Sequence, residues 1–206
     1  MSYYLSVIGC GGHAKVLLDT ICLLGLKVNF LYDDNFSLDQ PLNFMDKVVS
    51  PINFESSENA IIAIGDNYSR KEISTKAIKK IWVVIIHPTA IVSKDMFIDE
   101  GSVIMAGSIV QTGSRIGKHC IINTGSSIDH NCDIGDYVHV SPNVALTGGI
   151  SIGEGTHVGV GACVIPGIKI GKWAIIGAGS VIIRDVPDYA VVVGNPGKII
   201  KYNNEK

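Results

Sequence analysis

Aliphatic residues recur at every sixth position through the second half of the chain. Sixteen consecutive positions, spaced by six from Val92 to Ile182, hold Ile, Val or Leu without an exception. From residue 102 onward, the position two before each anchor is small or apolar, as at Ser108, Cys120 and Ala162. Because neither an α-helix nor a β-strand has a period of six, the chain must turn a corner every six residues with the anchor pointing inward. Such hexapeptide repeats are typical of a β-helix.

Three faces of this repeat close a triangular coil. The run predicts about five coils of about eighteen residues, each hydrogen-bonded to the next at roughly 4.8 Å, in a prism about 25 Å tall. The β-branched Ile and Val side chains suit short strands and fill the axis, which makes this half a rigid scaffold. Glycines directly after anchors are expected to supply turn conformations that a side chain would obstruct. They are Gly117, Gly135, Gly153, Gly159, Gly171 and Gly177.

The first part of the chain alternates between strand-like and helix-like patterns. The expected elements are strands at residues 3–8, 28–32, 60–64 and 83–86, and helices at residues 16–24 and 69–80. Ser69 is the expected N-cap of the second helix. This alternation predicts a Rossmann-like α/β domain over residues 1–86. His87 and Pro88 mark its boundary with a β-helix domain over residues 87–206.

The composition narrows the classes of partner and compartment. With 206 residues and a net charge of −2, the chain offers no electrostatic attraction to nucleic acid or to an anionic membrane. Every apolar run ends well before the roughly 18 residues of a membrane span, and the N-terminus lacks the charged region of a signal peptide. Five cysteines without a C-x-x-C spacing indicate reduced core residues in a cytoplasmic protein. We place Cys120, Cys132 and Cys163 at inward positions, which makes them poor nucleophiles.

A glycine-rich turn is the first motif with chemical content. Residues 9–14 (Gly-Cys-Gly-Gly-His-Ala) match G-x-G-x-x-A between an expected strand and an expected helix, the context that a dinucleotide-binding turn requires. Backbone N–H groups at the start of the helix can hold a diphosphate. Asp33 and Asp34 fall where such folds place the residue that reads the ribose or the base. The alternative is a tight turn beside solvated aspartates.

The six histidines are His13, His87, His119, His130, His139 and His157. A metal-dependent β-helix enzyme, such as the carbonic anhydrase built on this scaffold, needs three imidazoles that converge across a subunit boundary. The closely spaced histidine pair of that family is missing, since His130 and His139 are nine residues apart. We therefore predict no metal site. For His87 and His119 we expect surface or capping roles.

Several motifs spread along nearly the whole chain point to one family when they are taken together. They are the turn at residues 9–13, Asp33-Asp34-Asn35, residues 64–67 (Ile-Gly-Asp-Asn), His87-Pro88, the repeats around His130, and residues 194–198 (Gly-Asn-Pro-Gly-Lys). In this combination the chain resembles the NeuD-type bacterial hexapeptide acyltransferases. That family includes sialic acid O-acetyltransferases and the N-acetyltransferases of nucleotide-linked 4-amino-4,6-dideoxy sugars.

The resemblance implies a left-handed parallel β-helix and a homotrimer with acetyl-CoA bound in the groove between neighbouring β-helices. By motif match, His130 corresponds to the catalytic base. His139 corresponds to the residue that contacts the thioester region of acetyl-CoA. Gly148 corresponds to the backbone donor for the thioester carbonyl.

The remaining matches concern the two substrates. The resemblance places the pantetheine arm of acetyl-CoA along Val160, Gly161 and Ala178, and the acceptor pocket beside Asn123. The nucleotide-sugar pocket is matched by residues of the glycine-rich turn and of the segments that follow two of the strands. They are Gly11, Gly12, His13, Asp34, Gly65 and Asn67, with Asp33 beside them.

One position departs from the family's pattern. The family usually has Glu or Asp directly after the catalytic histidine, whereas this chain has Asn131. An amide can orient an imidazole through a hydrogen bond, but it cannot stabilise imidazolium as a carboxylate does. Either His130 is a weaker base, or Asp129, Asp133 or a carboxylate of the adjacent subunit takes that role.

The chemistry of acetyl transfer fits these residues. Transfer to an amine needs a base for the proton of the attacking nitrogen, a role that suits His130. It also needs a donor aimed at the thioester oxygen, either the N–H of Gly148 or His139. We therefore expect an acetyl-CoA-dependent N-acetyltransferase acting on the 4-amino group of a UDP- or dTDP-linked 4-amino-4,6-dideoxy sugar in surface glycan biosynthesis.

Two other functions remain open from the sequence. An O-acetyltransferase, or a transferase of another acyl group, shares every motif and differs only in the shape of the acceptor or donor. A non-catalytic nucleotide-sugar binding protein gains support from Asn131, while the intact His130 and the complete Gly-Asn-Pro tail argue against it.

Overall fold

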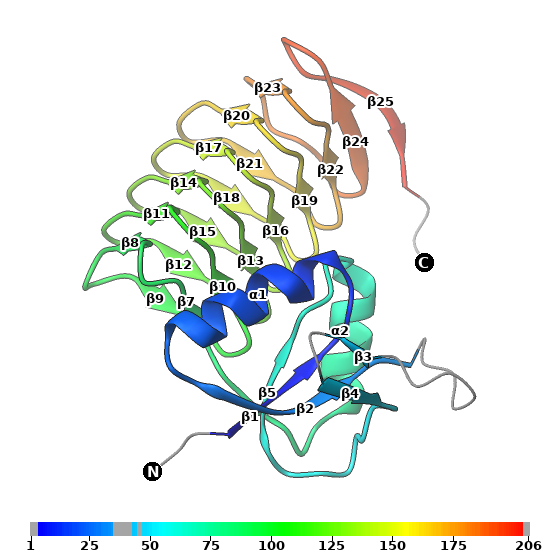
Figure 1. Ribbon diagram of the computed structural model, residues 1–206. Helices are drawn as coiled ribbons and strands as arrows, with labels where there is room; N and C mark the ends of the chain where they lie inside the picture. The colour runs from blue at the N-terminus through cyan, green and yellow to red at the C-terminus, as the bar shows by residue number, and fades with distance from the viewer. Residues whose placement is uncertain (1–3, 35–42, 45–46, 204–206) are drawn as a thin grey trace.

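The computed structural model describes residues 4–34, 43–44 and 47–203, and it has two parts: an α/β region and a triangular prism of short strands (Figure 1). Asn35, the last residue of the acidic motif, lies outside the described residues.

The α/β region holds a sheet ordered β3-β4-β2-β1-β5-β6, in which β3 alone pairs antiparallel. Its elements are β1 (Tyr4–Ile8), α1 (Gly12–Leu23), β2 (Lys27–Tyr32), β3 (Asn43–Phe44), β4 (Lys47–Ser50), β5 (Asn59–Ile62), α2 (Asn67–Lys76) and β6 (Ile81–Trp82).

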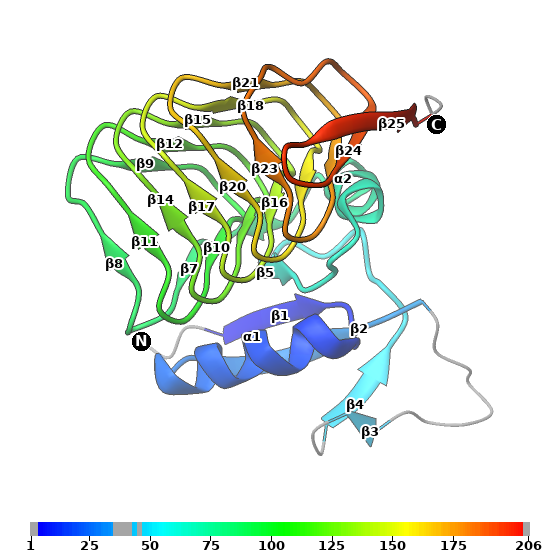
Figure 2. The same ribbon diagram turned by 90° about the horizontal axis from the view of Figure 1, so that it is seen from above.

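The prism consists of short strands, two residues long from β7 to β23, stacked into three faces of parallel strands (Figure 2). The first face contains β7 (Ile85–Ile86), β10 (Val103–Ile104), β13 (Ile121–Ile122), β16 (His139–Val140), β19 (His157–Val158), β22 (Ile175–Ile176) and β24 (Ala190–Val193), followed by the antiparallel β25 (Lys198–Tyr202). The second face contains β8 (Ile91–Val92), β11 (Ile109–Val110), β14 (Ser127–Ile128), β17 (Ala145–Leu146), β20 (Cys163–Val164) and β23 (Val181–Ile182). The third face contains β9 (Phe97–Ile98), β12 (Arg115–Ile116), β15 (Asp133–Ile134), β18 (Ser151–Ile152) and β21 (Lys169–Ile170).

The six-residue periodicity is confirmed as a left-handed parallel β-helix. Each strand from β7 to β20 pairs with the strand eighteen residues later, as in the register Ile104↔Ile122 and Ile122↔Val140. The second residue of each strand points inward, and these side chains form one continuous buried cluster along the axis. Backbone N–H groups from each coil donate to carbonyl groups of the next coil, so the corners as well as the strands are held.

A second core joins the two parts of the chain. Helix α1 buries Leu17 and Ile21, which pack in one cluster with Val103, Met105 and Ile121 of the first face. Both views show α1 and the sheet behind it lying beside that face (Figures 1 and 2). Burial of this shared apolar surface holds the α/β region in one position against the prism.

The expected strand at residues 83–86 is wrong. The α/β sheet ends with β6 at Trp82, and Ile85–Ile86 instead pairs with Val103–Ile104 as the first strand of the prism. The physical reason is already present in the periodicity, since Ile86 lies six residues before Val92 and continues the series of anchors. The division of the chain between residues 86 and 87 stays a prediction.

One local prediction also needs correction. Helix α2 begins at Asn67 rather than Ser69, because the Asp66 carboxylate caps it by accepting from the Ser69 N–H at 2.8 Å. The glycines after anchors lie, as expected, where a side chain would be obstructed. A Cβ on Gly117 would lie 2.8 Å from the next coil's backbone, so the close approach of the coils explains the glycine, although its φ is not left-handed. Left-handed corners occur elsewhere, as at Asn131 with φ 57°.

The cysteines divide differently from the prediction. All five are free thiols. Cys120 and Cys132 are buried, in agreement with inward positions, but Cys163 is exposed. It directly precedes the anchor Val164, and adjacent residues of a strand point to opposite sides, so its side chain must face outward. Cys22, on α1, is also exposed.

Candidate functional site

A cavity of about 420 Å³ lies at the carboxyl ends of β1, β2 and β5. Its lining combines the glycine-rich turn, the residues after β2, the loop after β4 and the start of α2. Six of the predicted nucleotide-sugar residues line it: Gly11, Gly12, His13, Asp33, Asp34 and Gly65. The structure therefore brings these separate sequence segments to one concave site.

The glycine-rich turn leaves space at the start of α1. Gly11 caps the helix in an extended conformation without a side-chain hydrogen bond. A Cβ added at Gly11 or Gly12 would meet no atom within 4 Å, so the protein's own packing does not require glycine there. At Gly9, by contrast, a Cβ would lie 2.6 Å from the Ile64 side chain. The open helix terminus, with its free N–H groups, has the form of an anion-binding site.

The two aspartates hold the walls of the cavity. Asp33 accepts a hydrogen bond from the Cys10 N–H at 2.8 Å, which fixes the glycine-rich turn. Asp34 accepts from the Ile52 N–H at 3.1 Å, which fixes the loop opposite. Asp33 is half-buried and Asp34 is exposed, so the alternative of a tight turn beside solvated aspartates stays open.

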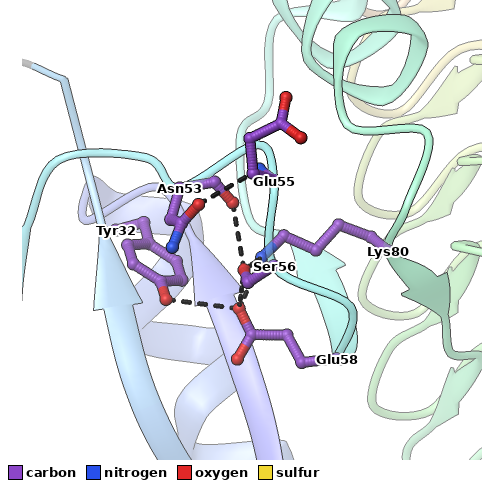
Figure 3. Close-up of polar contacts among 6 residues, drawn as sticks. All are labelled: Tyr32, Asn53, Glu55, Ser56, Glu58 and Lys80. Atoms are coloured by element: carbon purple, nitrogen blue, oxygen red, sulfur yellow. Dashed lines mark hydrogen bonds and ion pairs between the residues drawn. The ribbon is translucent and has the colours of Figure 1, made fainter.

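A buried ion pair fastens the loop that carries Ile52 and Phe54 into the cavity lining (Figure 3). The Lys80 ammonium is fully buried and contacts the Glu58 carboxylate and the Ser56 hydroxyl. Glu58 also accepts from Ser56 at 2.8 Å and from the Tyr32 hydroxyl at 3.2 Å. Because charges inside a protein must be paired, this network keeps the loop in one position against β2 and β5.

His139, on the first face, belongs to a hydrogen-bonded group at the junction with the α/β region. Its ring stacks on that of His157 with centroids 4.8 Å apart. Its Nε2 lies 3.1 Å from the Asn123 amide nitrogen, which can only donate, so Nε2 accepts and Nδ1–H donates to the Gly65 carbonyl at 3.3 Å. Burial, followed by His157 and Arg70, lowers the pKa of His139 to about 3. The ring is therefore neutral, with both nitrogens engaged.

His130 occupies an exposed corner between the second and third faces. Its Nδ1 lies 3.3 Å from the amide nitrogen of Asn131. The Asp129 carboxylate accepts a hydrogen bond from the backbone N–H of His130 at 2.8 Å, so it contacts the main chain of His130. Asp133 lies on β15 of the third face. In the part of the chain that the structure describes, neither aspartate pairs with the His130 ring.

Gly148 lies directly beneath the His130 ring. A Cβ at Gly148 would lie 2.5 Å from Nε2, so only glycine leaves room for the imidazole in this position. Hydrogen bonds between coils use the N–H groups of Thr147 and Gly149 but not that of Gly148. The corner thus combines an exposed imidazole with a backbone donor beside it.

The other predicted acetyl-CoA residues lie at a different edge of the prism. Val160, Gly161 and Ala178 are exposed at the corners between the first and second faces. Among the described residues, no hydrogen bond or ring contact joins the His130 group to the His139 group. Within one chain, the predicted site residues therefore form three separate groups: the cavity with His139, the edge at Val160, and the corner at His130.

Two residues of α2 differ from the sequence-based expectation. Asn67 does not line the cavity; its buried amide donates to the Gly155 carbonyl at 2.9 Å. Arg70, which the sequence analysis missed, is 1% exposed and fully hydrogen-bonded at the junction. The sequence does contain a signal, because Asn67, Arg70 and Ser74 recur at the intervals of one helix face. That face is polar, however, and a polar helix face normally indicates exposure to solvent.

Two classes of feature are absent from the described ranges 4–34, 43–44 and 47–203. No group of three His, Cys, Asp or Glu side chains gathers there in an arrangement that could hold a metal ion. No helix in those ranges is long and apolar enough to cross a membrane.

Two family profiles match parts of the chain. The PglD N-terminal domain matches residues 4–77, and the bacterial transferase hexapeptide (six repeats) matches residues 113–148. A sequence relative, UDP-N-acetylbacillosamine N-acetyltransferase of Bacillus subtilis, is 40% identical over 115 residues, 49% of this chain and 50% of its own. The match thus spans half the length of that curated relative, and 24% of a second one from a mimivirus.

Two solved structures match almost the entire chain. A mutant of perosamine N-acetyltransferase from Caulobacter crescentus, in complex with CoA and GDP-perosamine, is 36% identical with a TM-score of 0.90, covering 96% of both chains. The acetyltransferase domain of PglB from Neisseria gonorrhoeae is 35% identical with a TM-score of 0.89, covering 96% of this chain and 99% of its own. The same gonococcal domain has also been solved in complex with acetyl coenzyme A.

Proposed function

The chain belongs to the NeuD-type bacterial hexapeptide-repeat acyltransferases, and we propose that it transfers an acetyl group from acetyl-CoA to the 4-amino group of a nucleotide-linked 4-amino-4,6-dideoxy sugar. The observation that carries this proposal is the pairing of an open glycine turn at the start of α1 with an exposed His130 above Gly148. The first feature suits a nucleotide diphosphate, and the second suits proton removal beside a backbone donor.

The nucleotide sugar binds in the cavity of the α/β region. Its diphosphate lies at the N–H groups of Gly11, Gly12 and His13, where the helix terminus favours negative charge. Ile52 and Phe54 supply an apolar wall for the base. UDP and dTDP are the nucleotides expected from the sequence, and the GDP-linked sugar named with the Caulobacter structure adds a third to be tested.

Acetyl-CoA binds along the edge between the first and second faces. The exposed Val160 offers an apolar contact, and the small residues Gly161 and Ala178 leave space along the edge for the pantetheine arm. Because the His130 corner lies at the other edge of the second face, one chain alone cannot place this arm beside its own base.

A homotrimer resolves that separation. The outward residues of the second face are mainly apolar or small: Ile91, Ile109, Ser127, Ala145, Cys163 and Val181. Those of the third face are mostly charged: Phe97, Arg115, Asp133, Ser151 and Lys169. Packing three second faces around a threefold axis buries the less polar surface. It also brings the Val160 edge of one subunit next to the His130 corner of its neighbour.

In the resulting site, the sugar amine attacks the carbonyl carbon of the thioester while His130 accepts the amine proton. The C–N bond forms, the C–S bond breaks, and the departing thiolate takes up the proton from the imidazolium. The N–H of Gly148 donates to the developing oxyanion. His139 is less suited to that role, because it is neutral and both its nitrogens are already hydrogen-bonded.

The test is CoA release with a matched panel of UDP-, dTDP- and GDP-linked 4-amino-4,6-dideoxy sugars, with the acetylated product identified by mass spectrometry. The proposal expects product with an amino sugar and none with the 4-hydroxy analogue. Product formed only from the hydroxy analogue would make the chain an O-acetyltransferase. Tight binding of a nucleotide sugar without CoA release would make it a non-catalytic binding protein.

A further inference from the structure

Arg70 is the most deeply buried cation at the junction between the two parts of the chain, with 1% of its surface exposed. All of its guanidinium hydrogen bonds go to uncharged oxygen atoms. They reach the carbonyls of His119 (2.8 Å), Tyr137 (2.8 Å), Gly65 (3.0 Å) and Ile64 (3.1 Å) and the side-chain oxygen of Asn67 (2.8 Å). Burial lowers the pKa of Arg70 to about 10, so the side chain stays charged at neutral pH.

These acceptors come from both parts of the chain. Ile64 and Gly65 lie between β5 and α2 and line the cavity, and Asn67 begins α2. His119 and Tyr137 form left-handed corners of the prism, with φ 52° and 59°. Figure 1 shows α2 beside the prism. The planar guanidinium spans these acceptors with a fixed fork of donors.

The Gly65 carbonyl is the point where this network meets the proposed site. It accepts from Arg70 Nη1 at 3.0 Å and from His139 Nδ1 at 3.3 Å. Gly65 also lines the cavity. A displacement of this one peptide group would therefore change the floor of the nucleotide-sugar cavity and release the His139 ring together.

We propose that Arg70 is a positioning residue that fixes the segment at residues 64–67 against His139, and so sets where the bound nucleotide sugar lies relative to the acetyl-transfer corner. This inference rests on the proposed function. It assigns Arg70 no contact with either substrate. Its effect passes through the Gly65 carbonyl, and misplacement of a bound group by about 1 Å is enough to lower a rate about 100-fold.

Arg70 also contributes to the charge state of the junction. The titratable groups that face it there are His13 on α1, Asp66 at the start of α2, His139 and His157 on the first face, and His119, Cys120 and Tyr137 at or beside the corners. Burial first, and the Arg70 charge after it, lower the pKa of His13 and His119 to about 4. The same cation thus favours the neutral His139 that donates to Gly65.

The experiment compares Arg70→Lys, Arg70→Met and the control Lys71→Met. Lys71 is the next residue of α2 and also bridges to the prism, through Glu154 at 2.6 Å, but it contacts neither Gly65 nor His139. We expect Arg70→Lys to fold and to lower kcat/KM for the nucleotide sugar about 10- to 100-fold. The KM for acetyl-CoA should change less than about twofold, and Lys71→Met should leave both constants near wild type.

A second measurement does not depend on activity. Nitrogen-15 spectra of the histidine rings report which ring nitrogen of His139 carries the proton. The wild type and Lys71→Met should show His139 with its proton on Nδ1, while both Arg70 variants should show a mixture of the two neutral tautomers. A purely structural role would instead lower the melting temperature, with kcat/KM of the folded protein and the His139 tautomer unchanged, and that result would overturn the inference.

The two measurements separate failure of this inference from failure of the proposed function. If the wild type releases no CoA with any sugar of the panel, the proposed acetyl transfer fails, yet the His139 spectra and the affinity for a nucleoside diphosphate still test Arg70. If the wild type is active and Arg70→Lys retains both its kcat/KM and the Nδ1–H tautomer, Arg70 does not position the site.

Discussion

The side-chain amide nitrogen of Asn131 lies 3.3 Å from Nδ1 of His130, an arrangement that determines where the ring proton resides. An amide nitrogen only donates, so Nδ1 accepts and the proton of the neutral ring lies on Nε2. A base needs a free lone pair on its exposed nitrogen. For His130 to act as the proposed base through Nε2, the Asn131 amide must therefore turn over and accept from Nδ1–H. A carboxylate, which has no donor, would favour that tautomer at all times.

Asn131→Asp should convert this corner to the stronger base. Residue 131 has φ 57°, a region that Asn and Asp adopt more readily than Glu, so Asp is the variant with the least strain. The added anion stabilises imidazolium, so the acidic limb of the kcat/KM profile should move to higher pH. Above that limb the rate should rise, by up to about 10-fold. The pH–rate profile of the purified variant provides the measurement.

If Asn131→Asp leaves the kcat/KM profile unchanged, residue 131 does not tune the base. Asp129→Asn and Asp133→Asn would then be compared in the same assay.

Gly148→Ala should displace the His130 ring, because the added methyl group would lie 2.5 Å from Nε2. We expect kcat to fall by about 10² to 10⁴, the range for loss of a general base, with nucleotide-sugar affinity almost unchanged. His130→Ala should have a similar effect. The double variant should be no slower than His130→Ala alone, since both changes remove the same function. If the loss of kcat in the double variant, expressed as a free energy, equals the sum of the two single losses, Gly148 and His130 act independently.

Ala145→Arg should separate the subunits, because the new charge lies in the apolar row of the second face. Ser151→Arg, at the equivalent position of the third face, should leave the trimer intact. Sedimentation velocity measures the masses. Alkylation gives a second readout: the wild-type trimer should protect Cys163 relative to the exposed Cys22, and Ala145→Arg should remove that protection. A fully active wild-type monomer would contradict the shared site.

Acid should destabilise the fold through its buried histidines. Burial lowers the pKa of His13 and His119 to about 4 and that of His139 to about 3. Imidazoles of an unfolded chain titrate near 6.5, so below that pH the unfolded state binds more protons than the folded state. Stability should be complete above about pH 6.5 and fall toward pH 4, by at most about 1.4 kcal/mol per pH unit for each histidine.

Urea unfolding at pH 7.5, 6.5 and 5.5 measures this slope. His119→Asn should reduce it, since Asn tolerates the left-handed corner, with φ 52°, and does not titrate. His87→Asn, near the beginning of the prism, serves as the control. A slope that is identical in wild type and His119→Asn would exclude His119 as a source of the acid sensitivity.

Lys80→Met should cost about 3–5 kcal/mol of the free energy of unfolding, because it leaves the Glu58 carboxylate without its buried partner. The adjacent pair, Lys79 with Glu55, lies on the surface, so Lys79→Met should cost much less of the free energy of unfolding than Lys80→Met. Denaturant titration of both variants gives the comparison. Equal losses would show that burial does not distinguish the two pairs.

The sequence predicted the features that depend on local periodicity and missed those that depend on distant contacts. The six-residue repeat reveals the prism because each corner recurs in the chain itself, and the glycine turn is recognisable between its strand and helix. Arg70 was missed because its partners lie up to 67 residues away and a polar helix face normally indicates solvent. The prediction placed Cys163 inward, but the inward position belongs to the preceding residue, Ala162.

The core beneath α1 limits any exchange of the α/β region between members of the family. Leu17 and Ile21 belong to one buried cluster with Val103, Met105 and Ile121, so an α/β region grafted onto a foreign prism would meet a surface shaped for other side chains. A graft that carries these three prism residues with it should fold cooperatively as one unit. A graft that is joined to the foreign prism only through the chain should leave the α/β region loosely attached and should slow binding of the nucleotide sugar.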